Sequence, residues 1–144
     1  MSAEDNKAIA RRGWEELWNK GNLAIAAEHY APDYVVHMPG TAKVRGPEAQ
    51  TQQVLLYRTA FPDLHFTIED QIAEGDKVVN RVTARGTHRG EFRGIPPTGK
   101  QMMVTGVTID RIVGGKLQES WASWDFLGVL QQLGVVPGPG PGGG

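Results

Sequence analysis

Cysteine is absent from the 144-residue chain, which excludes disulfide bonds, thiolate chemistry and metal centres with cysteine ligands. The absence also suits a reducing cytoplasm, where we expect the protein to reside. Excess charge is lacking as well, since 15 Lys and Arg against 16 Asp and Glu give a net charge of −1. A nucleic-acid-binding surface needs clustered positive charge. We therefore expect no nucleic-acid partner.

Long hydrophobic runs are also missing. No apolar stretch approaches the roughly 20 residues that a membrane-spanning helix needs. The N-terminal sequence MSAEDNKAIARR contains no signal-peptide core. We therefore expect no membrane partner.

The sequence lacks the usual motifs of metal and phosphate sites. The four histidines, at positions 29, 37, 65 and 88, form no HxH, HxxxH or HExxH pattern. The glycine-bearing loops GEFRG and GIPPTGK lack the GKS or GKT of a phosphate-binding loop, and there is no GxSxG nucleophile motif. Metal-dependent catalysis is thus not indicated, and no metal site is expected.

The spacing of apolar residues changes from helical to alternating near position 62. Ser2 followed by Asp5 resembles a capping box, which should begin a helix that ends at Gly21. The expected segments after it are a short helix over 23–30, a strand over 34–38, a loop over 39–46 and a helix from Gly46-Pro47 to Phe61. Strands are expected over 64–72, 77–86, 101–112 and 116–125, and Leu64, Phe66, Ile68 and Ile72 should share one face of the first of them.

Helices followed by a mostly antiparallel sheet and a last helix predict an α+β fold, with helices covering one face of a curved sheet. The length suits one domain, which we place at residues 1–136. The sequence PGPGPGGG can form neither a helix nor a central strand, so residues 137–144 are expected to be a disordered tail.

The stretch from Gly114 to Gly134 carries the main functional signal. Gly114-Gly115 fits a two-residue hairpin turn, and alternation then places Leu117, Glu119, Trp121, Ser123 and Asp125 on one strand face. A face that mixes Leu and Trp with carboxylates fits a half-apolar pocket with an ionisable group at its mouth. Asp125 precedes a short amphipathic helix, so it could cap that helix or act as a general acid/base. Spacing alone does not decide between the two roles.

Other ionisable residues are weaker candidates. His37 lies on a short strand with hydrophobic neighbours, where it could move a proton or sit at a pocket rim bonded to a carbonyl. Arg81, in the middle of a strand, needs a carboxylate partner such as Glu119 or Asp125, or else forms a surface pair. His88 could reach over a pocket, but its glycine-rich loop favours water. His29 and His65 lie on faces expected to be exposed.

Several motifs resemble those of the SnoaL-like polyketide cyclases, also called ester cyclases, of the nuclear transport factor 2-like superfamily. They are WNKGN, HMPG, RGPEA, AFPDLHF, GTHRGEF with RGIPPTGK, and GKLQESWASWD with LGVLQQLG, and they cover the chain almost to Pro137. The resemblance implies a cone-shaped, curved and mostly antiparallel sheet with helices on its concave face. It also implies an enzyme without metal or organic cofactor that closes a ring of a polyketide-like small molecule by intramolecular aldol condensation.

The same resemblance assigns roles to residues. Asp125 matches the acid/base aspartate near the end of the last strand, and we expect His37 to assist it. The expected substrate-binding residues are Trp14, Arg81, His88, Glu119, Trp121 and Ser123. We expect these side chains to surround a cavity of several hundred Å³, the usual size of a small-molecule site.

Two other functions stay open. A protein of this fold could bind a small ligand without turning it over, or simply dimerise. An epoxide hydrolase-like enzyme is also conceivable, with Arg81 in its relay, although Thr83 stands where a second carboxylate would be expected. We expect a homodimer, formed through a second sheet face bearing Trp124 and Ala122.

Overall fold

A curved six-stranded sheet organises the chain in the computed structural model, which describes residues 2–40 and 42–138. Its strand order is β2-β1-β6-β5-β4-β3. Strands β1 and β6 pair in parallel, and all other neighbouring strands of the sheet pair antiparallel. The strands are β1 (Tyr30–His37), β2 (Val44–Arg45), β3 (His65–Glu74), β4 (Lys77–Thr87), β5 (Gln101–Val113) and β6 (Lys116–Trp124).

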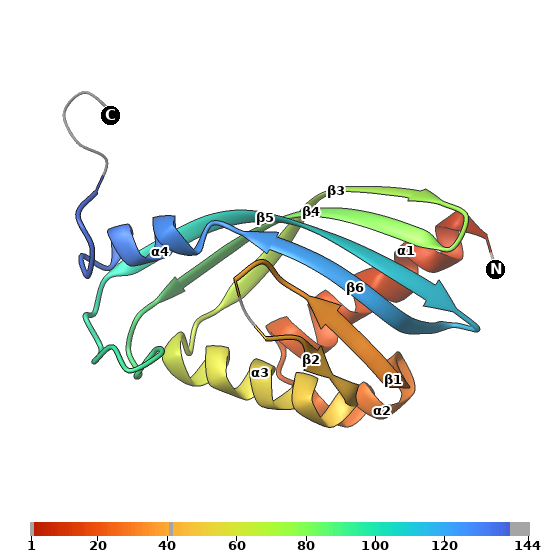
Figure 1. The fold of residues 1–144 in the computed structure, drawn as a ribbon, viewed down its shortest axis with the longest axis horizontal. Helices are drawn as coiled ribbons and strands as arrows, with labels where there is room; N and C mark the ends of the chain where they lie inside the picture. The colour runs from red at the N-terminus through yellow and green to blue at the C-terminus, as the bar shows by residue number, and fades with distance from the viewer. Residues whose placement is uncertain (1, 41, 139–144) are drawn as a thin grey trace.

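Helices cover one face of this sheet, and α3 lies across from it (Figure 1). They are α1 (Ala3–Arg12), the π-helix η1 (Gly13–Asn19), the 3₁₀-helix η2 (Leu23–Ile25), α2 (Ala26–His29), α3 (Gly46–Ala60) and α4 (Phe126–Gln132). The predicted α+β fold, with helices on the concave face, is confirmed. No helix among the described residues is long and apolar enough to cross a membrane. The single-domain boundary stays a prediction, and residues 139–144 of the expected tail lie outside the described part.

The capping box at Ser2 and Asp5 begins α1 as the sequence predicts, and Pro47 stands in the first turn of α3. The short second helix, however, ends at His29 instead of Tyr30. Strand β1 begins at Tyr30, earlier than the predicted start at residue 34, and it contains Pro32. Proline fits because the β1/β6 register shifts between Tyr30 and Val35, and an irregular stretch needs no ladder N–H at that position. The predicted loop over 39–46 contains the short strand β2.

Two β-bulges alter which side chains face inward. In β3 the register shifts between Ile68 and Asp70, so the alternation reverses and Ile72 is 66% exposed. The prediction that Ile72 shares the buried face of Phe66 is therefore wrong. A bulge in the antiparallel β5/β6 pair has larger consequences, because β6 carries most of the predicted site.

Candidate functional site

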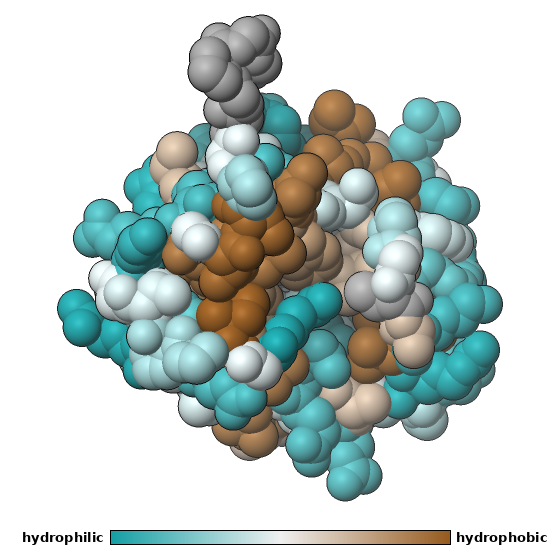
Figure 2. Space-filling view, turned by 60° about the vertical axis from the view of Figure 1, so that its left-hand side comes forward, coloured by the Kyte–Doolittle hydropathy of each residue, from teal (hydrophilic) through white to brown (hydrophobic). Residues whose placement is uncertain are grey.

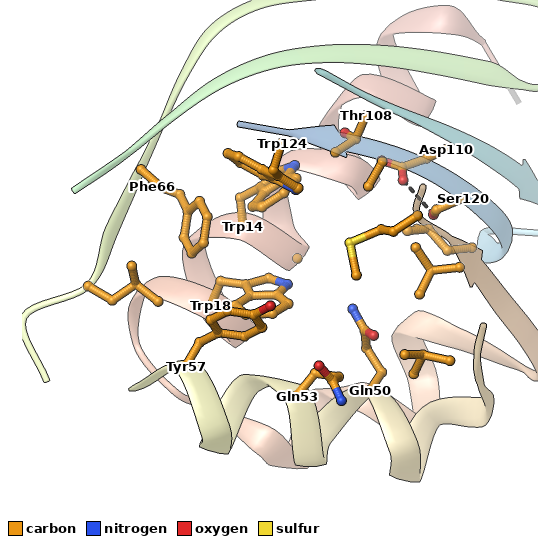
Figure 3. A pocket seen from close by; sticks show the side chains of 18 of the residues that line it. Trp14, Trp18, Gln50, Gln53, Tyr57, Phe66, Thr108, Asp110, Ser120 and Trp124 are labelled. Atoms are coloured by element: carbon orange, nitrogen blue, oxygen red, sulfur yellow. Dashed lines mark hydrogen bonds between the residues drawn. The ribbon is translucent and has the colours of Figure 1, made fainter. Parts of the chain in front are cut away.

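A cavity of about 140 Å³ lies between the helices and the concave sheet face. Its aromatic wall joins η1, β3 and β6, with ring centroids 5.1 Å apart for Trp14 and Phe66 and 6.3 Å apart for Trp14 and Trp124 (Figure 3). Trp18 and Tyr57 also line the cavity. The expected cavity volume of several hundred Å³ is therefore wrong, because these aromatic rings occupy much of the space between the helices and the sheet.

Asp110 is the one carboxylate among the described residues that line the cavity. It projects from β5, is 5% exposed, and accepts hydrogen bonds from Ser120 Oγ at 2.7 Å and from Asn80 Nδ2 at 2.9 Å. Burial raises the pKa of Asp110 to about 6, although both hydrogen bonds act in the opposite direction. A carboxyl group with such a pKa can both accept and return a proton near neutral pH.

The Asn80 side chain is held from behind. Gln71 Nε2 donates to Asn80 Oδ1 at 2.9 Å, so the Asn80 amide must turn its N–H groups toward Asp110 and Thr108 Oγ1. Gln71 Nε2 is itself tied to the carbonyl oxygen of Lys7 in α1. Asp110 therefore sits in a fixed polar network on an otherwise apolar sheet face.

Polar side chains on α3 face Asp110 across the cavity. Gln50, Gln53 and Tyr57 follow helical spacing and line the cavity together, and Gln50 and Gln53 point from α3 into it (Figure 3). Gln50 Nε2 makes one long contact, 3.5 Å to the Tyr30 hydroxyl. These amides can donate hydrogen bonds to carbonyl oxygens of a bound molecule.

His29 also lines the cavity, and the prediction that it is exposed is wrong. It is 3% exposed because the end of α2 packs its ring directly on Gly13 of η1, where a Cβ atom would collide with Nε2. Burial and then the nearby Arg12 lower the pKa of His29 to about 4. His29 is therefore neutral at physiological pH.

Asp125 lies outside the cavity. Its carboxylate is exposed and accepts the backbone N–H of Gly128 at 2.9 Å as the N-cap of α4. The reason is the β6 bulge, because Arg111 pairs with Glu119 and Ile112 with Leu117, leaving Gln118 as an extra residue. Leu117 therefore shares the inner face with Ser120, Ala122 and Trp124. The prediction that apolar side chains shelter Asp125 is therefore wrong, and the catalytic role expected for Asp125 loses the support of that environment.

Three other residues predicted on that face, Glu119, Trp121 and Ser123, point to the outer side of the sheet. Glu119 Oε2 lies 2.6 Å from His37 Nε2, Trp121 stacks on His37 at 5.6 Å, and Ser123 is exposed. The hydrogen bond from His37, together with Arg111, lowers the pKa of Glu119. His37, Glu119 and Trp121 form one cluster with Arg111, and the cluster is outside the cavity.

Arg81 and His88 are also separate from the cavity lining. Arg81 pairs with Asp70 at 2.7 Å on the surface, not with Glu119 or Asp125. His88 is fully buried, not in water, because Thr98 binds its Nδ1 and Phe61 packs on its ring. Of the eight predicted site residues, the structure brings Trp14 alone to the cavity.

The sequence did contain a signal for Asp110. Met102, Val104, Gly106, Thr108, Asp110 and Ile112 alternate onto one buried face of β5. A single carboxylate on an otherwise apolar or small-residue face implies a built polar site or a functional group. No cluster of metal-ligand side chains occurs in the described part of the chain.

Comparisons with known proteins place the chain among characterised relatives. Residues 8–133 match the SnoaL-like polyketide cyclase family profile. Aklanonic acid methyl ester cyclase DnrD of Streptomyces peucetius is 32% identical over 89% of this chain and 90% of its own length. Nogalonic acid methyl ester cyclase of Streptomyces nogalater is 33% identical, with 81% of this chain and 89% of its own covered. AclR of Streptomyces galilaeus, described as a candidate hydroxylase, has a TM-score of 0.85 at 30% identity, covering 97% and 87% of the two chains.

Proposed function

Because the chain belongs to the SnoaL-like polyketide cyclase family, we propose that it closes a ring in a small polyketide-like molecule by an intramolecular aldol reaction. The observation that carries the proposal is the Asp110 carboxylate inside an aromatic cavity, with a pKa raised to about 6. Asp110 takes the acid/base role that the sequence suggested for Asp125.

The reaction needs a proton removed and a proton returned. Ionised Asp110 takes a proton from a carbon between two carbonyl groups, and the enolate carbon then forms a C–C bond with a ketone carbon of the same molecule. The ketone oxygen becomes an alkoxide and receives the proton, which leaves Asp110 ionised again. The product is an isomer of the substrate. Ser120 and Asn80 hold Asp110 throughout.

The cavity walls supply the remaining requirements. The flat faces of Trp14, Trp18 and Trp124 favour a folded, planar conformer of the substrate. This conformer holds the enolate carbon next to the ketone carbon, which lowers the entropic cost of ring closure. Gln50 and Gln53 can donate hydrogen bonds to the oxygen where charge develops. A carbon flanked by two carbonyls is already acidic, so we propose that the reaction needs no metal or organic cofactor.

Binding without turnover is the second candidate, because an aromatic cavity alone would serve it. The epoxide hydrolase-like alternative has less support, since the described cavity lining includes no arginine and Arg81 pairs with Asp70 on the surface.

The homodimer stays a proposal, but the surface proposed for its interface changes. Trp124 and Ala122 face inward, whereas Met103, Val107 and Trp121 are exposed on the outer sheet face. The cytoplasmic location also stays a prediction.

A conversion assay distinguishes a cyclase from a binding protein. We expect the wild-type protein to convert an aromatic β-keto ester that carries a second ketone within reach into a cyclic isomer of unchanged mass. The same incubation in D₂O should exchange the acidic C–H for deuterium faster than buffer without protein does, in molecules that enolise without closing. Chromatography with mass detection measures both. Binding of the probe with neither conversion nor exchange above the rate without protein would favour the non-catalytic alternative.

A further inference from the structure

The cavity opens between two groups of partly exposed lining residues. Met38, Val44, Gln53 and Tyr57 form one side, and Trp124 and Phe126 form the other. Figure 2 looks at the end of the molecule that carries α4 and shows hydrophobic side chains gathered around a hollow. Leu127 is 59% exposed at this end and Met103 56%.

Arg93 joins the two sides of this opening. Its Nη2 donates to the Tyr57 hydroxyl of α3 at 3.0 Å, and its guanidinium carbon lies 4.6 Å from the centre of the Phe126 ring of α4. The same carbon is 5.5 Å from the Phe92 ring. All three partners line the cavity, so the positive charge of Arg93 is held at its mouth.

The backbone fixes this position. Phe92 and Ile95 exchange both backbone hydrogen bonds, at 3.0 and 2.9 Å, around the turn Arg93-Gly94. Arg93 has a φ of 51° and Gly94 one of 82°, and no other non-glycine residue in the described ranges has positive φ. Two positive φ values define a type I′ turn, for which arginine is a poor residue. A side chain kept at a backbone position that disfavours it points to a function of that side chain.

Most of the binding capacity of this guanidinium is unused. The ion pairs of the described residues do not include Arg93, and Tyr57 occupies a single donor out of five. The planar fork of N–H groups matches a carboxylate, while the aromatic rings beside it exclude water from one side.

We infer that Arg93 binds an anionic group of the substrate at the cavity mouth, so the substrate is a planar ring compound with a free carboxylate. The inference rests on the proposed function, which identifies the cavity with Asp110 as the substrate site. The two cyclases named above act, by their names, on methyl esters, whereas the geometry here fits the acid. The acidic C–H reaches Asp110 while the carboxylate stays at the rim.

The test is calorimetric binding of 2-naphthoate and of methyl 2-naphthoate, which share a ring system and differ in charge. The wild-type protein should bind the acid at least about tenfold more tightly than the ester. Arg93→Asn should abolish this preference, because the affinity for the acid should fall to about that for the ester. Because Asn-Gly is a preferred pair for a type I′ turn, this variant should fold at least as well as the wild type.

Arg89→Asn is the matched control, since Arg89 is an exposed arginine of the same loop and its loss changes net charge equally. It should keep the tenfold preference. Equal affinities in the wild type, a preference that persists in Arg93→Asn, or failure of both compounds to bind would overturn the inference. The measurement needs no turnover, so an inactive protein that still prefers the acid would refute the cyclase and keep the anion site.

Discussion

Asp110→Asn is expected to reduce the rate of ring closure by about 10²–10⁴-fold, the usual contribution of a general acid/base. The substitution keeps the shape of the side chain. The new amide can accept from Asn80 and donate to Ser120, so both hydrogen-bond positions stay filled. Binding of the probe should be largely kept, which places the loss in kcat rather than KM.

Asp125→Asn is the matched control, because it removes one carboxylate in the same isosteric way. Asparagine is as good an N-cap as aspartate, so α4 should stay intact. We expect near wild-type kcat for this variant. The opposite pair of results, a slow Asp125→Asn and an active Asp110→Asn, would return the acid/base role to Asp125.

The second large effect concerns the pH dependence of stability, where two buried groups act in opposite directions. Asp110 has a pKa of about 6 in the folded protein against 3.8 as its ordinary value. Between these values the folded state binds more protons, so the free energy of unfolding falls as pH rises from about 4 to about 6. The shift corresponds to about 3 kcal/mol.

His29 has the opposite sign. Its pKa is about 4 in the folded protein against an ordinary value of 6.5. The unfolded state binds more protons between these values, so stability rises with pH across that window, again by about 3 kcal/mol. The two contributions largely cancel in the wild-type protein.

Single variants should reveal each contribution. Relative to Asp110→Asn, the wild type should lose about 3 kcal/mol of stability between pH 4 and 7, and relative to His29→Gln it should gain about as much. Urea unfolding followed by tryptophan fluorescence measures both differences. Carboxyl groups with lowered pKa, such as Asp63 and Glu119, contribute equally to the stability of all three proteins, so their contributions cancel in these differences. Parallel pH curves for the three proteins would show that neither group is perturbed by burial.

The fold was predictable because local signals and the global pattern agree. The Ser2 capping box, Pro47 at the start of α3 and the glycine pair at 114–115 each mark an element boundary that the structure contains. The change from helical to alternating spacing near Pro62 correctly separates the helices of the first half from the long strands.

The site was not predictable to the same degree, because its residues depend on strand register. One extra residue at Gln118 moves Glu119 and Trp121 to the outer face and brings Ser120 to Asp110. No local property of the sequence marks that bulge. Asp110 was different, since simple alternation along β5 places it on the buried face.

The most direct test of the account is a ¹³C NMR titration of the aspartate carboxyl groups. We predict one resonance that titrates with a midpoint near pH 6 and is missing from the spectrum of Asp110→Asn. The contrary result is that every aspartate, Asp110 included, titrates below about pH 4.5, as ordinary solvated carboxyl groups do.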